Sequence, residues 1–114
     1  MRIYFPGGKK VFMDTGKFII ETDQGERGGG EGSAPEPFTL FLASLGTCAG
    51  IYIKQFCDMR NIPADQIEIH QEIDYDQEAR RIKAVNLKVK LPDDFPEKYK
   101  AAVLKAADQC AVKK

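Results

Sequence analysis

The segment from Phe38 to Ile53 contains no charged residue at any of its positions, and this limits the possible folds more than any other feature of the chain. Pro37 precedes the segment, and proline suits the first turn of a helix. We predict a helix from about Pro37 to about Arg60, where Asn61-Ile62-Pro63 ends it. A membrane span needs about 20 apolar residues, so the run is short for one. In a soluble chain, a helix that is apolar on all sides is expected to be buried at the centre of the fold.

The composition fits one soluble domain over residues 1–114. Two autonomous cores would each fall near the lower size limit for a domain. Lys and Arg number 17, as do Asp and Glu, so the formal net charge is zero. This balance argues against nucleic acid or an anionic membrane as partner, because both demand a positive surface. The 3 cysteines, an odd number, indicate reduced thiols in a cytoplasmic protein rather than a disulfide framework.

The first third of the chain has the pattern of three short strands, at Arg2–Phe5, Lys9–Met13 and Lys17–Thr22, separated by glycine-containing turns. A glycine-rich loop, Asp23–Ala34, follows them. It lacks the Gly-Lys-Ser/Thr ending of a phosphate-binding loop, so we interpret it as a mobile flap or a connector.

The middle of the chain predicts an antiparallel hairpin. Apolar and polar residues alternate from Ile67 to Tyr75 and again from Val85 to Leu91, and Asp76–Arg81 supplies the turn. One polar face is acidic and the other is basic, which suits cross-strand pairs. The acidic residues near the turn favour a solvated hairpin end over a metal site; they are Asp74, Asp76 and Glu78.

A second helix is predicted after Pro96, with Asp93 or Asp94 as its cap. Spacings of four, three and four place a set of residues on one inward-facing stripe of this helix; they are Tyr99, Val103, Ala106 and Cys110.

Most catalytic machinery is missing from the sequence. The only histidine, His70, lies on the polar face of a predicted strand, where a solvated or pairing role is favoured over catalysis. No zinc spacing and no dinucleotide motif occurs, so no metal site is predicted. The cysteines are the remaining candidates for chemistry.

The three thiols fall on the two predicted helices. Cys57 follows Cys48 by nine positions, which places it on the opposite side of the same helix. A pair between Cys48 and Cys110 is allowed if the two helices pack closely. The alternative is that all three cysteines pack as small hydrophobic residues.

The pattern Pro-x-Pro-x-x-Leu-x-Leu-Ala-x-Leu-Gly-x-Cys from Pro35 to Cys48, with Cys110-Ala111-Val112 further on, resembles the OsmC/Ohr superfamily of osmotically inducible and organic hydroperoxide resistance proteins. The resemblance spans essentially the whole chain. It implies an α+β fold, with antiparallel sheets wrapped around a long central apolar helix plus a second helix, in an interlocked homodimer. It also implies that a C-terminal strand is missing from this sequence.

The resemblance implies a thiol-dependent hydroperoxide reductase, with organic hydroperoxides favoured over hydrogen peroxide. Cys48 would be oxidised by the peroxide, and Cys110 would resolve the product as a disulfide. An external dithiol would then reduce that disulfide, and no metal, flavin or haem cofactor is needed.

Two positions depart from the pattern of the peroxidase members. Phe38 stands where those members carry a glutamate, and Lys9 stands where they carry an arginine. Lys9 would supply positive charge to substrate. Glu36 is a candidate to replace the acid, although a role in the turn or at the helix entry is favoured for it. The departures favour an alternative, a non-enzymatic dimer that binds a small apolar molecule or has a stress-related or redox-regulatory role.

Overall fold

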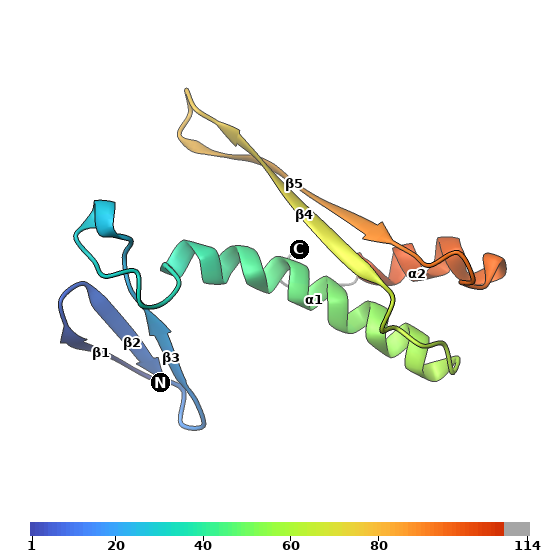
Figure 1. Ribbon diagram of the computed structural model, residues 1–114, viewed down its shortest axis with the longest axis horizontal. Coiled ribbons are helices and arrows are strands. Elements are labelled where there is room, and N and C mark those ends of the chain that lie inside the picture. The colour runs from blue at the N-terminus through green and yellow to red at the C-terminus, as the bar shows by residue number, and fades with distance from the viewer. Residues whose placement is uncertain (109–114) are drawn as a thin grey trace. The chain divides into compact units, whose positions relative to one another are not determined.

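The computed structural model describes residues 1–108 of the chain, which has the predicted α+β composition (Figure 1). The chain divides into two compact units, with the boundary after Ala43. The described part contains a three-stranded sheet, a two-stranded sheet, two α-helices and two short 3-10 turns.

The first unit is built on an antiparallel sheet in the order β1-β2-β3. Its strands are β1 (Arg2–Gly7), β2 (Lys10–Asp14) and β3 (Ile19–Thr22). The third strand begins two residues later than predicted, because the Thr15 backbone N–H donates to the Phe18 carbonyl oxygen (2.9 Å) and closes a turn there.

The two faces of this sheet differ in character. On one face, Tyr4 packs edge-to-face on Phe12 with ring centroids 5.8 Å apart, and the Arg2 guanidinium lies 4.4 Å from the Tyr4 ring centre. The register aligns Ile3, Met13 and Ile20, which therefore share the other face. Ile3 keeps 56% of its surface exposed, so this second face is apolar and incompletely covered within the unit.

Helix α1 (Pro37–Met59) has the predicted bounds to within a residue. Its buried residues recur every four positions and form one stripe; they are Leu45, Ala49, Ile53 and Cys57. Phe41 and Ile51 each keep 50% of their surface exposed. The prediction of a helix buried on all sides is therefore wrong for the chain by itself, which covers a single stripe.

The length of α1 also weakens the sequence argument against a membrane span. The helix continues past the uncharged run, and an 18-residue window of it has a mean hydropathy of 1.3, with 28% of that window buried. By length and composition alone it would pass as a membrane-spanning helix, but the core helix of a soluble protein passes the same test. The expectation of no membrane partner stays a prediction.

The second unit contains the predicted hairpin of β4 (Glu68–Asp76) and β5 (Arg81–Lys90). One cross-strand ion pair of the expected kind forms between Glu72 and Lys88, at 3.2 Å. At the turn, the Asp76 carboxylate accepts hydrogen bonds from the backbone N–H groups of Glu78 (3.0 Å) and Ala79 (3.1 Å). This turn geometry gives the acidic hairpin end a structural role.

The second helix differs from its prediction in its start and in its buried face. A 3-10 turn, Glu97–Tyr99, precedes α2 (Lys100–Ala107), and no side chain caps either element, so Asp93 and Asp94 are not caps. Val103 and Ala107 are buried, whereas Ala106 of the predicted stripe is half-buried. Cys110 lies outside the described residues.

The hairpin approaches α1 where the helix carries glycine. A Cβ atom added to Gly46 would lie 2.7 Å from the Gln71 Oε1 atom on β4. One turn further along, a Cβ on Gly50 would lie 3.8 Å from Ile69 Cδ1, an ordinary van der Waals contact. A side chain at position 46 would therefore have to displace the end of the Gln71 side chain, whereas a Cβ atom at position 50 would fit.

We predict that Gly46→Leu destabilises the protein by about 1–3 kcal/mol, because the added side chain overpacks the contact between α1 and β4. Gly50→Ala is the matched control, and it should be neutral or stabilising, since alanine favours a helix by up to about 1 kcal/mol over glycine. Urea unfolding measures both changes. A Gly46→Leu protein as stable as the parent would show that this contact is misplaced.

Candidate functional site

Cys48 lies in the middle of α1, directly before the buried Ala49, and is itself half-buried. Its sulfur is disulfide-bonded and does not titrate as a free thiol. Cys110, which the resemblance pairs with Cys48, lies outside the described residues, so that pairing stays a prediction.

Cys57 has a different environment from Cys48. It is a free thiol with no exposed surface, and it belongs to the buried stripe of α1. Burial raises the pKa of the Cys57 thiol, and the nearby Asp58 carboxylate raises it further. A thiol with a raised pKa carries little thiolate at neutral pH, so Cys57 is poorly suited to nucleophilic chemistry.

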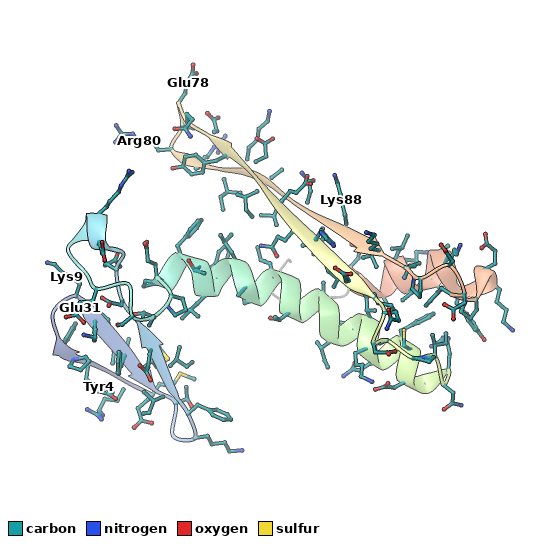
Figure 2. The ribbon with its side chains drawn as sticks, viewed as in Figure 1. Tyr4, Lys9, Glu31, Glu78, Arg80 and Lys88 are labelled. Atoms are coloured by element: carbon teal, nitrogen blue, oxygen red, sulfur yellow. The ribbon has the colours of Figure 1, made fainter. Side chains whose placement is uncertain are left out.

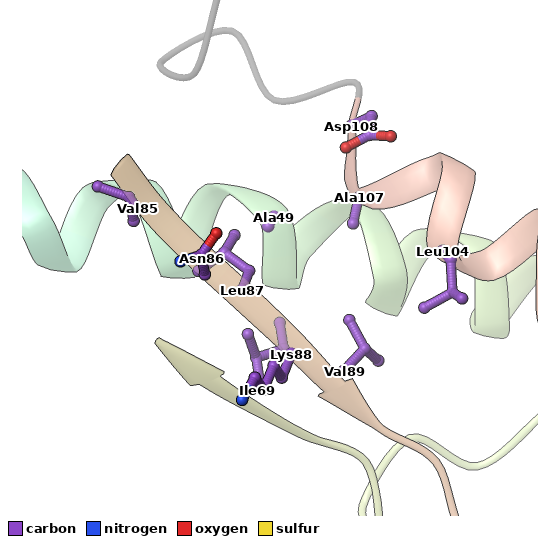
Figure 3. A pocket seen from close by; sticks show the side chains of 10 residues that line it. All are labelled: Ala49, Ile69, Val85, Asn86, Leu87, Lys88, Val89, Leu104, Ala107 and Asp108. Atoms are coloured by element: carbon purple, nitrogen blue, oxygen red, sulfur yellow. The ribbon is translucent and has the colours of Figure 1, made fainter. Parts of the chain in front are cut away.

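A cavity of about 530 Å³ lies beside the α1 turn that carries Cys48 (Figure 3). Its lining comes from α1, from both strands of the hairpin and from α2. Most of the lining is apolar, with three polar residues among the ten; the residues are Ala49, Ile69, Val85, Asn86, Leu87, Lys88, Val89, Leu104, Ala107 and Asp108. The chemistry of these walls suits an apolar group better than a charged one.

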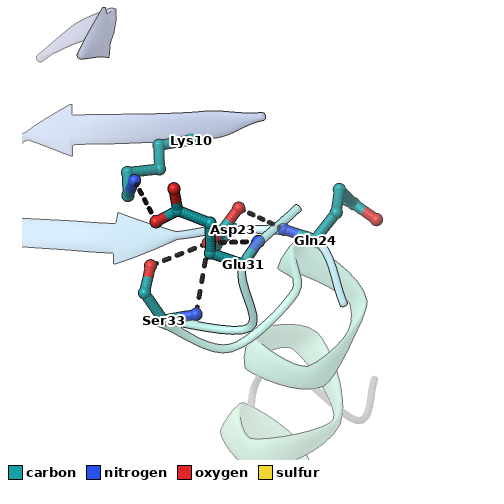
Figure 4. A network of polar contacts seen from close by, with 5 residues as sticks. All are labelled: Lys10, Asp23, Gln24, Glu31 and Ser33. Carbon is teal, nitrogen blue, oxygen red and sulfur yellow. Dashed lines mark hydrogen bonds and ion pairs between the residues drawn. The ribbon is translucent and has the colours of Figure 1, made fainter. Parts of the chain in front are cut away.

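In the first unit, a buried carboxylate organises the glycine-rich loop after β3, which we call the 23–34 loop (Figure 4). Asp23 keeps 1% of its surface exposed. Its Oδ2 atom accepts hydrogen bonds from the Ser33 hydroxyl (2.7 Å), the Ser33 backbone N–H (3.2 Å) and the Glu31 backbone N–H (3.3 Å). Its Oδ1 atom accepts one from the Gln24 backbone N–H (2.7 Å). We predicted only a flap or a connector here, and the structure adds this network.

The same contacts change the pKa of Asp23. The Ser33 hydroxyl is the largest influence, and together with the three backbone N–H donors it lowers the pKa to about 2, although burial opposes the change. Nearby, the Lys10 ammonium lies 3.0 Å from the Glu31 carboxylate, and this hydrogen bond raises the pKa of Lys10.

Two of the predicted site residues lie against the 23–34 loop. A Cβ atom on Gly29 would lie 3.4 Å from Lys9 Cε, and one on Gly25 would lie 3.5 Å from Glu36 Oε1. Figure 2 labels Lys9 and Glu31 at the same end of the first sheet. Lys9 and Glu36 thus both line this loop, Lys9 at the turn between β1 and β2 and Glu36 just before α1.

Phe38 lies in the first turn of α1 and keeps 52% of its surface exposed. Its ring stacks on that of Phe41, with centroids 6.2 Å apart. Phe38 therefore contributes an exposed apolar surface at the start of the helix and offers no charge or hydrogen bond to a substrate.

The two remaining sequence candidates are the histidine of β4 and a possible metal site. His70 Nε2 lies 3.1 Å from Glu68 Oε1 on the exposed face of β4, which confirms the pairing role predicted for it. Within residues 1–108, no three His, Cys, Asp or Glu side chains group closely enough to hold a metal ion.

Asp23 is the functional candidate that the sequence prediction missed. An acidic residue at the end of a strand, followed by glycines and then by a serine ten positions later, is the available signal. This sequence signal is not specific, because Asp, Gly and Ser all favour turns and therefore occur in any solvated loop. The burial of the Asp23 carboxylate distinguishes the organised loop seen here from an ordinary solvated loop.

Comparison with known proteins identifies the fold. A family profile described as "OsmC-like protein" matches residues 30–114. No curated protein matches the chain. A solved Psychrobacter arcticus structure, described as an osmotic stress induced and detoxification response protein, is similar with a TM-score of 0.77 and 18% identity, over 97% of this chain and 82% of that one.

Two further solved structures share the fold. One is the organic hydroperoxide resistance protein OsmC from Legionella pneumophila, with a TM-score of 0.62 and 21% identity over 97% of this chain and 82% of that one. The other is the organic hydroperoxide resistance protein OhrB from Bacillus subtilis, with a TM-score of 0.57 and 22% identity over 98% of this chain and 87% of that one.

The lowered pKa of Asp23 predicts a pH-dependent contribution to stability. The folded-state pKa of about 2 lies below the ordinary value of 3.8, so the contribution is complete above about pH 4 and is lost as the pH falls toward 2. Asp23→Asn should therefore be less stable than the parent at pH 6, and the difference should shrink between pH 4 and pH 2. Urea unfolding across this range measures it, with the exposed Glu21→Gln as control. A difference independent of pH would contradict the assignment.

Proposed function

The chain belongs to the OsmC-like protein family, and on that premise we propose that it is a thiol-dependent hydroperoxide reductase. Cys48 is the residue oxidised by the peroxide, and Cys110 is the resolving cysteine. An external dithiol restores both thiols, and the reaction needs no metal or organic cofactor. The proposal places the protein in the cytoplasm, where such dithiols are kept reduced.

The proposed reaction has three stages: oxidation of Cys48, formation of a disulfide with Cys110, and reduction of that disulfide. The Cys48 thiolate attacks the distal peroxide oxygen, so an S–O bond forms, the O–O bond breaks, and the alkoxide leaves and takes up a proton to become the alcohol. The Cys110 thiol then attacks the sulfenic sulfur, which forms an S–S bond and releases water. Two exchange steps with the external dithiol return both cysteines to thiols and leave the reductant as a disulfide.

The observation that carries the proposal is the contrast between Cys48 and Cys57 on the same helix. Cys48 is half-buried and disulfide-bonded, whereas Cys57 is a fully buried free thiol with a raised pKa. Reversible formation of a disulfide is the chemistry that a two-cysteine peroxidase requires. The environments of the two residues favour Cys48 for that role.

The substrate class follows from the surroundings of the helix. The apolar walls of the cavity beside Ala49 support an organic hydroperoxide with an apolar body over hydrogen peroxide. In this proposal the Lys9 ammonium donates a hydrogen bond to the peroxide. Glu36 and Phe38 are further candidates for substrate contact, with Phe38 providing apolar surface only.

The same cavity favours the second candidate function, in which a dimer binds a small apolar molecule without turnover. Phe38 has no proton to exchange and no charge, so it cannot replace a catalytic glutamate. This alternative predicts that Cys48 reacts with peroxide no faster than an ordinary thiol. One kinetic experiment therefore separates the two functions.

We expect fast oxidation of the reduced protein by cumene hydroperoxide, with loss of two thiols per chain in a single turnover. Cys48→Ser should abolish the reaction, because the attacking thiolate is gone. Cys110→Ser should stop it at a sulfenic acid that a dimedone label detects. Cys57→Ala is the matched control and should retain the reaction. Oxidation of the parent no faster than that of a free thiol in buffer would reject the peroxidase and favour ligand binding.

A homodimer is the second part of the proposal. The apolar face of the first sheet borders a cavity of about 270 Å³, with little polar surface in its walls. A monomer would leave this face and the exposed aromatic side chains of α1 in water. A second copy of the chain would bury them.

The two isoleucines of β3 test this dimer, because neighbouring residues of a strand point to opposite faces. Ile20 lines the apolar cavity, whereas Ile19 does not line it and is paired with Asp14 on the opposite face of the sheet. We predict that Ile20→Glu shifts the protein toward monomer in sedimentation velocity experiments and that Ile19→Glu leaves the dimer intact. A monomeric parent protein, or equal effects of the two changes, would contradict the prediction.

A further inference from the structure

The hydrogen bonds of Asp23 join the two ends of the 23–34 loop. Its Oδ2 atom gathers donors from Glu31 and Ser33, residues that lie eight and ten positions further along the chain. The Gly32 backbone N–H adds a hydrogen bond to the Gln24 carbonyl oxygen (3.0 Å). The two ends of the 23–34 loop are therefore held together by one buried carboxylate and a backbone contact beside it.

The closed loop leaves no room for a side chain at its centre. A Cβ atom on Gly30 would collide with the Gln24 carbonyl oxygen and would lie 2.7 Å from Asp23 Oδ1. The position before it, Gly29, has a φ of 86°, a left-handed conformation that favours glycine. The Gly29 and Gly30 backbone N–H groups donate to the Glu26 and Gly25 carbonyl oxygens (3.1 Å each), within the loop whose two ends Asp23 holds together.

Lys9 and Lys10 both contact the 23–34 loop. The Gly29 backbone packs near the Lys9 stem, with Cε 3.4 Å from the place of a Cβ atom on the glycine and Cγ 3.9 Å from it. The Lys10 ammonium pairs with the Glu31 carboxylate of the same loop at 3.0 Å. Lys9, in the turn before β2, and Lys10, the first residue of β2, therefore both contact the 23–34 loop.

We propose that Asp23 is a positioning residue that fixes the Lys9 side chain through the 23–34 loop. This inference rests on the proposed function, which assigns Lys9 to substrate binding. A lysine side chain that is free in solvent samples many rotamers. Packing against the loop limits these rotamers, so less conformational entropy is lost when the ammonium binds substrate. Asp23 itself touches no substrate, since its oxygens are occupied by the loop.

A double-mutant cycle on the single-turnover oxidation of Cys48 tests the connection between the two residues. We expect Lys9→Gln to slow the reaction by at least about fivefold, the size of a single charge interaction at a protein surface. Asp23→Asn should cause a similar loss, and the double variant should be no slower than Lys9→Gln alone. A merely structural role for Asp23 would instead make the two losses multiply.

Glycine variants repeat the test without a change of charge. Gly30→Ala should open the loop and reproduce the loss seen with Asp23→Asn, because its Cβ has no space. Gly25→Ala is the matched control, since a Cβ there meets only Glu36 Oε1 at 3.5 Å, and its rate should equal that of the parent. A Gly30→Ala protein with the parent rate would overturn the inference.

A spectroscopic readout makes the inference independent of turnover. In the parent, nuclear Overhauser contacts should join the Lys9 methylene protons to Gly29, and Asp23→Asn should remove them while the β1–β2 contacts remain. Retained Lys9–Gly29 contacts, or multiplied losses in the cycle, would overturn the role of Asp23. A parent protein that does not reduce peroxide would instead reject the proposed function, whatever the contacts show.

Discussion

The fold depends on the burial of α1, a helix that is apolar around most of its circumference. The chain covers one stripe of it, from Leu45 to Cys57, with the hairpin and α2. Aromatic and aliphatic side chains remain exposed elsewhere on the helix, and in the proposed homodimer a second copy of the chain covers them. Gly46 and Gly50 lie beside this stripe, where α1 meets the Gln71 and Ile69 side chains of β4.

Much of this architecture could be predicted because it depends on local patterns. The bounds of α1 follow from an uncharged run between prolines, and the hairpin follows from strict alternation, which also sets which residues of β4 and β5 face the core. The start of α2 could not be predicted in the same way. Residues 93 and 94 lie in a turn closed by a hydrogen bond from the Phe95 backbone N–H to the Pro92 carbonyl oxygen (3.0 Å), and aspartate favours such turns as well as helix caps.

The candidate site was predicted less completely than the fold. Motif spacing identified Cys48, and helix geometry separated it from Cys57. Asp23 was missed because its partners lie up to ten positions away and its burial depends on how the whole 23–34 loop folds. The exposed side of α1 was missed for a related reason, since sequence periodicity shows that a face is apolar and does not show which chain covers it.

The central claim is that Cys48 and Cys110 form the redox pair while Cys57 packs as a buried thiol. Differential alkylation with mass spectrometry tests it directly. The reduced protein is treated with one equivalent of cumene hydroperoxide, alkylated in its folded state and mapped by peptide. We predict a Cys48–Cys110 disulfide, with Cys57 alkylated only after unfolding. A disulfide or sulfenic acid at Cys57, or three unchanged thiols, would contradict it.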